Sequence, residues 1–191
     1  MKHIKNFAFV MAAALMVMAC KTQMVDKLDD FNLENGGYMR TVTPFPVAAA
    51  TFSVSKANMT GTKMEAVLEA VTPDKGALFS SYDLSVRFVD ATPDNGNKSV
   101  AVTALRSIPA SAYAKDATTG YPRHTLAVTG TDLLTATKLT AADVSNGDRF
   151  EVTATMRLTN GRSFNAANTG ANITGGAFYS SPFFYRVNVV N

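Results

Sequence analysis

Residues 150–159 read Phe-Glu-Val-Thr-Ala-Thr-Met-Arg-Leu-Thr, a strict alternation of apolar and polar side chains. Because successive side chains of a β-strand point to opposite faces, this period of two predicts a half-buried antiparallel strand. Asn160-Gly161 follows at once, and this dipeptide is typical of a tight hairpin because both residues tolerate positive φ. The face that begins with Glu151 is expected to be exposed. The side chains expected to point into the core are Phe150, Val152, Met156 and Leu158.

Similar patterns recur along the chain. Residues 82–88 place Tyr, Leu, Val and Phe on one face, and residues 183–190 form a third strong strand. Residues 63–71 fit a helical stripe and a strand face equally well, and the surrounding β pattern favours a strand. Turn-forming Pro, Asp, Asn and Gly residues separate the candidates. Shorter strands are predicted at residues 38–42, 52–55, 100–105 and 124–128.

A short helix is predicted within this β pattern. Thr131 can cap a helix that runs to residue 138, and Thr140 with Asp143 has the spacing of a capping box for one further turn. About seven or eight strands, with a turn roughly every ten residues, predict an all-β fold. We expect a single antiparallel β-sandwich of the immunoglobulin or fibronectin type, with one short helix, over residues 36–191.

The N-terminus has the parts of a bacterial secretion signal. Two lysines precede the apolar run of residues 7–19, which is shorter than the roughly 20 residues needed to span a membrane. The run ends in Val17-Met18-Ala19-Cys20, which resembles the lipobox of bacterial lipoproteins. We expect residues 1–19 to be a cleaved lipoprotein signal peptide, Cys20 to be lipidated, with acyl chains such as palmitate, and residues 20–35 to be a flexible tether. The alternative is an ordinary secretory signal with an incidental cysteine.

Composition argues against several functional classes. Removal of residues 1–19 takes away two of the 18 Lys and Arg residues and leaves 16 basic against 15 acidic side chains, so no nucleic-acid partner is expected. A single cysteine excludes an internal disulfide. His124 is the only histidine after residue 20, and the chain has no G-x-S-x-G motif. We therefore expect no catalytic site, no metal centre and no cofactor.

The loop of residues 90–97 leaves two interpretations open. Its Asp and Asn side chains could supply oxygen ligands to calcium, although their spacing differs from that of an EF-hand. The same residue types form turns through their own hydrogen bonds, and this interpretation is favoured. The residues concerned are Asp90, Asp94, Asn95 and Asn97.

Aromatic side chains are the candidates for a binding surface. The chain has no tryptophan, the side chain that most favours sugar stacking. Tyr113, Tyr121 and Tyr179 lie in predicted loops and are the first candidates for glycan binding. The final strand is expected to lie at a sheet edge, where Phe and Arg side chains favour a protein partner. The hypothetical protein-contact surface consists of Phe178, Tyr179, Phe184 and Arg186.

Three segments carry a resemblance that spans nearly the whole of residues 36–191. They are residues 34–42, 89–96 and 175–185, which read ENGGYMRTV, VDATPDNG and GGAFYSSPFFY. They resemble accessory lipoproteins of starch-utilisation-system-type nutrient-uptake loci, a SusE-like or SusCD-associated group. The glycan-binding modules that follow the first domain in starch-binding members have no counterpart in this chain.

This resemblance implies a non-catalytic lipoprotein of the outer membrane, lipid-anchored and facing the extracellular side. It implies the role of an accessory subunit in a TonB-dependent import complex for glycans or peptides. The implied partners are the TonB-dependent barrel and its lid lipoprotein. The alternative is a free-standing glycan-binding lipoprotein.

Overall fold

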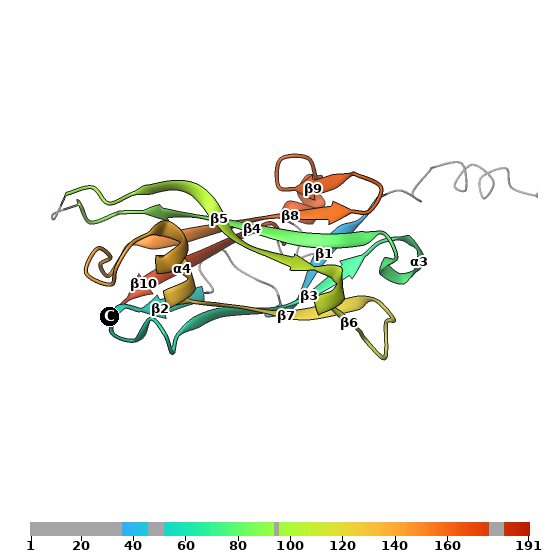
Figure 1. Cartoon of the computed structure of the whole chain (residues 1–191), viewed down its shortest axis with the longest axis horizontal. Coiled ribbons are helices and arrows are strands. Elements are labelled where there is room, and N and C mark those ends of the chain that lie inside the picture. Colours follow the sequence, from blue (N-terminus) through green and yellow to red (C-terminus); the bar gives the residue numbers. More distant parts are fainter. Residues whose placement is uncertain (1–35, 46–51, 94–95, 176–181) are drawn as a thin grey trace, which may run out of the picture. The chain divides into compact units, whose positions relative to one another are not determined.

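The alternating segments of the sequence form the strands of the computed structural model, which describes residues 36–45, 52–93, 96–175 and 182–191 (Figure 1). Within these residues the strands form two sheets. The first sheet has the order β1-β3-β7-β6 and consists of β1 (Tyr38–Thr43), β3 (Lys63–Val71), β7 (Pro122–Thr129) and β6 (Ala114–Lys115). The second sheet has the order β2-β10-β8-β4-β5 and consists of β2 (Phe52–Ser55), β10 (Phe184–Val190), β8 (Arg149–Leu158), β4 (Phe79–Val89) and β5 (Val100–Pro109). The expected all-β sandwich is confirmed at this level.

Short segments connect the strands. The strand β9 (Ser163–Asn165) pairs with β8 outside the main strand order. The helical connections in the described part of the chain are η2 (Lys56–Asn58), α3 (Pro73–Gly76), η4 (Ala110–Ala112), α4 (Gly130–Thr137) and α5 (Ala171–Thr174). In α3 the backbone turns through positive φ at Asp74, Lys75 and Gly76. A side chain at Gly76 would also lie 2.3 Å from Pro122, so only glycine fits.

The core lies between the two sheets. The inward face predicted for β8 is confirmed, since Phe150, Val152, Met156 and Leu158 are all buried. Residues 63–71 form a strand, as the β context favoured, and its buried apolar side chains belong to the same core cluster. Burial of a larger side chain of this face, such as Met64 or Leu68, contributes about 1.5–3 kcal/mol.

The position of the last strand corrects a prediction. β10 does not lie at a sheet edge, because β2 pairs with it in parallel from Val187–Phe52 to Val190–Ser55. On its other side β10 pairs with β8 in antiparallel register. The chain leaves the first sheet after β1, and Pro44 provides no N–H group to continue that pairing. The segment that returns as β2 then covers the edge of β10.

The predicted hairpin at Asn160-Gly161 is confirmed, with a different turn. Only Gly161 of the two residues adopts positive φ, at 83°. The backbone bonds Gly161 N–H to Leu158 O and Leu158 N–H to Arg162 O close the turn at 3.1 and 2.9 Å. The loop is therefore wider than a two-residue turn and leads into β9.

Helix α4 lies between β5 and β7 in Figure 1. Its N-cap is Thr129 rather than the predicted Thr131, because Thr129 forms a complete capping box with Asp132. The further turn predicted at Thr140 is present but is not helical, and in it the Asp143 carboxylate accepts hydrogen bonds from Thr140. Arg106 of β5 donates to Ala127 O at 3.1 Å and pairs with Asp132, so it ties β5 to both β7 and α4.

Polar groups also occur inside the sandwich. The hydroxyl of Tyr82 donates to Pro182 O and lies 3.4 Å from the hydroxyl of Tyr185. Thr41 of the first sheet lies 3.2 Å from the same Tyr185 hydroxyl. Burial raises the pKa of both tyrosines above the usual value, so they are neutral hydrogen-bonding groups. The contact between Tyr185 and Thr41 links the two sheets.

Candidate functional site

The outer face of the second sheet carries a row of charged side chains, and two of the predicted contact residues lie on it. Arg186 of β10, Glu151 of β8 and Arg87 of β4 are directly opposite one another in register. Arg149 lies two residues before Glu151 and therefore on the same face. We call these four residues the arginine row.

Glu151 is the centre of the arginine row and corrects the expectation that its face is exposed. Its side chain is only 4% exposed, because Arg87 and Arg149 fold over it. Arg87 donates to Oε2 at 2.6 Å and Arg149 donates to Oε1 at 2.8 Å. Partial burial raises the pKa of Glu151, but these arginine contacts outweigh it and hold the pKa below its usual value. Glu151 is therefore charged at neutral pH.

Phe184 and Arg186 are two residues apart on β10, so their side chains lie on the same face of the sheet. Both side chains are partly exposed. The Nε atom of Arg186 is buried and has no hydrogen-bond partner among the residues that the structure describes. The structure thus brings these two predicted residues together beside Glu151.

A notch lies on this face where the neighbour of β8 changes from β9 to β10. It has a volume of about 270 Å³. Hydroxyl and amide groups line it from β4, β8 and β9, together with Phe183. Ser85 and Thr153 are two residues from Arg87 and Glu151 on the same strands, so the notch adjoins the arginine row. The polar residues that line it are Ser85, Thr153, Thr155 and Asn165.

A scan against protein-family models found no match. A search of curated proteins found no match either. The resemblance stated for the sequence therefore remains a prediction.

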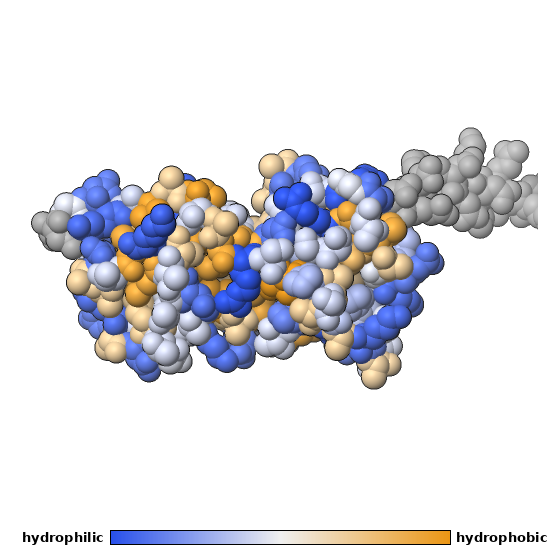
Figure 2. Space-filling view, viewed as in Figure 1, coloured by the Kyte–Doolittle hydropathy of each residue, from blue (hydrophilic) through white to orange (hydrophobic). Residues whose placement is uncertain are grey.

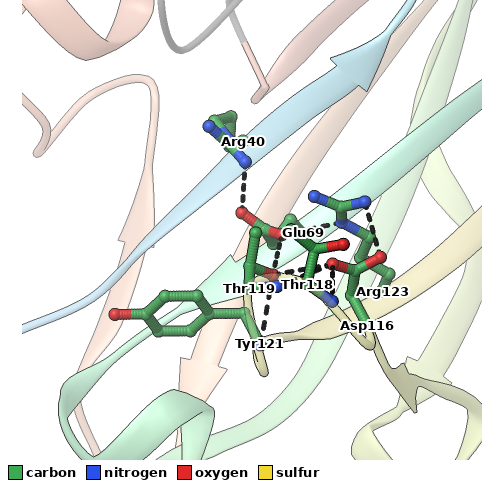
Figure 3. A network of polar contacts seen from close by, with 7 residues as sticks. All are labelled: Arg40, Glu69, Asp116, Thr118, Thr119, Tyr121 and Arg123. Atoms are coloured by element: carbon green, nitrogen blue, oxygen red, sulfur yellow. Dashed lines mark hydrogen bonds and ion pairs between the residues drawn. The ribbon is translucent and has the colours of Figure 1, made fainter.

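A second polar network holds the loop that carries Tyr121 (Figure 3). Glu69 of β3 is 2% exposed and accepts hydrogen bonds from Arg40, Thr119 and Arg123. Arg123 also donates to Asp116 at 2.7 Å. These contacts hold the turn after β6 against the first sheet.

Tyr121 itself is partly buried. The ammonium group of Lys75 lies 4.7 Å from the centre of its ring, which is cation–π geometry. One face of the ring is therefore covered by a side chain of α3. Figure 3 shows its hydroxyl pointing away from Glu69.

Tyr113 lies in the loop after η4, as predicted, but its side chain is buried. It is 8% exposed, and its ring packs edge-on against Phe79 at 4.7 Å. His124 lies on its other side, 5.0 Å away, and bonds to Ala112 O through Nδ1. Tyr113 therefore belongs to the core in this structure and offers no open ring surface. Its hydroxyl is buried and has no hydrogen-bond partner within the described part of the chain.

Three predicted residues cannot be placed. Phe178, Tyr179 and Cys20 lie outside the described residues. The signal peptide and the tether lie outside them as well. Within the described residues, no helix is both long and apolar enough to cross a membrane.

The loop of residues 90–97 uses its described side chains for turn hydrogen bonds. Asp90 accepts from the backbone N–H groups of Thr92 and Lys98, at 2.9 and 2.8 Å. Asn97 accepts from Ser99 N–H at 2.8 Å. Across the ranges that the structure describes, no group of three His, Cys, Asp or Glu side chains is arranged to hold a metal ion.

The edge strand β5 carries an exposed apolar side chain. Val102 is 63% exposed, and Figure 2 shows apolar side chains gathered over β5 and α4 on the viewed face. The pairing of β5 with β4 shifts twice, between Leu84 and Ser85 and between Val86 and Phe88. Such irregularities twist an edge and discourage the addition of a further strand.

Sequence reasoning missed the two buried glutamates. Both Glu69 and Glu151 lie on faces that the alternation assigns to solvent. A signal was present for Glu151, because Arg149 lies two residues before it on the same strand face. No comparable signal marks Glu69, whose partners Arg40 and Arg123 are 29 and 54 residues away.

Proposed function

We propose that this chain is a non-catalytic lipoprotein of the outer membrane, anchored through Cys20 and facing the extracellular side. It acts as an accessory subunit of a TonB-dependent import complex for glycans or peptides. The lipobox and the resemblance of residues 34–42, 89–96 and 175–185 support this assignment. Its partner is the barrel or the lid lipoprotein of the complex.

One structural observation supports the protein-contact role most directly. Phe184 and Arg186 lie side by side on the outer face of the second sheet, and the exposed Arg87 side chain extends the same surface. Aromatic and arginine side chains are enriched in protein interfaces, where they supply most of the binding energy. Both residues are held by pairing with β8, and β2 pairs with the same strand from Val187 onward, so the surface is preorganised.

We also propose that the sandwich is of the immunoglobulin type. The order β1-β3-β7-β6 supports this, since it corresponds to strands A, B, E and D of that fold. The order β10-β8-β4-β5 corresponds to strands G, F, C and C′. In this assignment α4 is the connection between strands E and F.

The notch favours a second candidate function, that of a free-standing glycan-binding lipoprotein. Its hydroxyl and amide groups can exchange hydrogen bonds with sugar hydroxyls, and Ala166 and Ala167 add apolar groups to its lining. Retention on an immobilised polysaccharide, lost in a Thr153→Val variant, would favour this candidate.

Co-purification tests the first proposal. The full chain carrying an affinity tag is expected to recover a TonB-dependent barrel or its lid lipoprotein from detergent-solubilised membranes. Phe184→Ser is expected to lower this recovery, whereas Phe45→Ser serves as a matched control because Phe45 is a 60% exposed aromatic on another part of the domain. Recovery of no transporter component, together with retention on polysaccharide, would replace the subunit role with glycan binding.

A further inference from the structure

The arginine row holds more positive charge than its own carboxylate can neutralise. Arg87, Arg149 and Arg186 come from three neighbouring strands and surround the single carboxylate of Glu151. Among the described residues, no other acidic side chain has a hydrogen bond or ion pair with these arginines. The row therefore presents a net positive charge on the outer face of the second sheet.

Arg186 is the arginine of the row that has no carboxylate partner among the described residues. It lies directly opposite Glu151, but both carboxylate oxygens already accept hydrogen bonds from Arg87 and Arg149. The Nε–H of Arg186 is buried without an acceptor in the described part of the chain. A guanidinium group has five N–H donors, and a buried donor without a partner is unfavourable. The buried Nε–H is closed to a ligand, but the side chain is partly exposed, so an incoming carboxylate can reach its outer N–H donors.

We infer that the arginine row binds the carboxylate groups of an acidic, extended segment of the partner protein. This inference rests on the proposed role as a subunit of an import complex. Neighbouring strands lie about 4.8 Å apart, so Arg87 and Arg186 are separated by roughly 10 Å. Carboxylates at alternate positions of an extended peptide repeat about every 7 Å, and flexible arginine side chains span the difference.

The chemistry of the row fits carboxylates. The planar guanidinium fork forms two parallel hydrogen bonds with a carboxylate, and such charge-assisted pairs are stronger than neutral ones. Arg87 is available for this role because its side chain is 51% exposed while it holds Glu151. Carboxylate positions of the segment would lie over Arg186 and Arg87.

The neighbouring residues favour a protein segment over an acidic sugar. Phe184 lies two residues before Arg186 on the same face and can pack against an apolar side chain beside the acidic ones. Arginine and aromatic side chains together are typical of protein interfaces. Acidic polysaccharide is the competing occupant, and the experiment separates the two.

Binding of poly-L-glutamate to the full chain in detergent provides the test, measured by fluorescence polarisation at low salt. Arg186→Gln is expected to weaken binding by at least about tenfold. Arg157→Gln is the control: Arg157 lies on the same strand as Glu151 but pairs with Asp83 instead. This substitution is expected to change binding by less than about twofold. Arg186→Lys keeps the charge but loses the fork, and is expected to give an intermediate loss. Unchanged thermal unfolding of Arg186→Gln shows that the loss is not due to misfolding.

Several outcomes would overturn the inference. The inference is wrong if a folded Arg186→Gln protein binds poly-L-glutamate as tightly as the wild type. Binding of polygalacturonate through Arg186, without binding of poly-L-glutamate, would assign the row to an acidic sugar instead.

Co-purification separates this inference from the proposed function. If wild type and Arg186→Gln recover the transporter equally, the subunit role stands and the inference fails. If Arg186 binds poly-L-glutamate but no transporter is recovered, the site chemistry stands and the subunit role fails.

Discussion

The Nε–H of Arg123 donates to Oε2 of the buried Glu69 at 2.7 Å, so a side chain at the start of β7 neutralises a carboxylate on β3. Arg40 of β1 pairs with the other carboxylate oxygen. The hydroxyl of Thr119 donates to Oε2 at 2.8 Å. Three strands and one turn of the first sheet thus meet at a single carboxylate.

Replacement of Glu69 by glutamine is expected to destabilise the domain by about 2–3 kcal/mol, because it leaves Arg40 and Arg123 without their shared counter-charge. Urea unfolding of the full chain measures the difference. Glu65→Gln is the matched control on the same strand, since Glu65 is about half exposed and pairs with the equally exposed Lys63. A change within about 0.5 kcal/mol is expected. Equal effects of the two substitutions would contradict the role of Glu69.

The buried tyrosines give a second pair of variants with opposite expectations. Tyr82→Phe removes the donor to Pro182 O and is expected to lower the free energy of unfolding by about 1–2 kcal/mol. Tyr113→Phe removes a buried hydroxyl that has no partner within the described residues, and is expected to be neutral or slightly stabilising. Thermal unfolding of both variants is the measurement. A larger loss for Tyr113→Phe than for Tyr82→Phe would show that the hydroxyl contacts are assigned wrongly.

The alternation of β8 predicts strongly different effects at adjacent positions. Val152→Asp places a carboxylate in the core without a partner, at a cost of several kcal/mol, and is expected to unfold the domain. Thr153 lies on the outer face and is partly exposed, so Thr153→Asp is expected to be tolerated. Circular dichroism and thermal unfolding distinguish the two. Similar stability in both variants would refute the register of β8.

The capping box of α4 makes stability depend on pH. Partial burial raises the pKa of Asp132, but hydrogen bonds from Thr129 and the nearby Arg106 outweigh this and hold the pKa below its usual value. The unfolded pKa is about 3.9. A folded pKa below it means that the stabilisation is complete above about pH 4 and is lost as the pH falls through the folded value.

Asp132→Asn is therefore expected to cost about 1 kcal/mol at pH 7 and to differ little from the wild type near pH 2. Urea unfolding at both pH values provides the comparison. A difference that persists undiminished at pH 2 would mean that the charge of Asp132 does not stabilise α4.

Cys20→Ala tests the lipid anchor. The variant is expected to accumulate as precursor or to leave the membrane fraction, because acyl chains on Cys20 are the proposed attachment. Metabolic labelling with a fatty-acid analogue is the measurement, and the wild type is the control. Label that persists in the variant would place the acylated group elsewhere.

Local patterns were sufficient to predict most strands and their inward faces. The apolar face of residues 150–159, the strand at residues 63–71 and the return after Asn160-Gly161 all follow from side-chain periodicity and turn chemistry, which act over a few neighbouring residues. The helix cap was misplaced by two residues, because both Thr129 and Thr131 can cap a helix and only the partner Asp132 distinguishes them.

The sequence by itself thus determined the all-β character of the chain, the course of its main strands and the composition of the candidate contact face. The tertiary structure decided which polar side chains of those strands are buried and which strand is an edge. Glu151 is buried because Arg87, 64 residues away, folds over it. β10 is internal because the chain crosses from the first sheet after β1 and pairs with it as β2. The ring of Tyr113, in the loop after η4, is buried because Phe79 of β4 packs against it. Each of these outcomes depends on a partner distant along the chain, and periodicity within one strand carries no information about such partners.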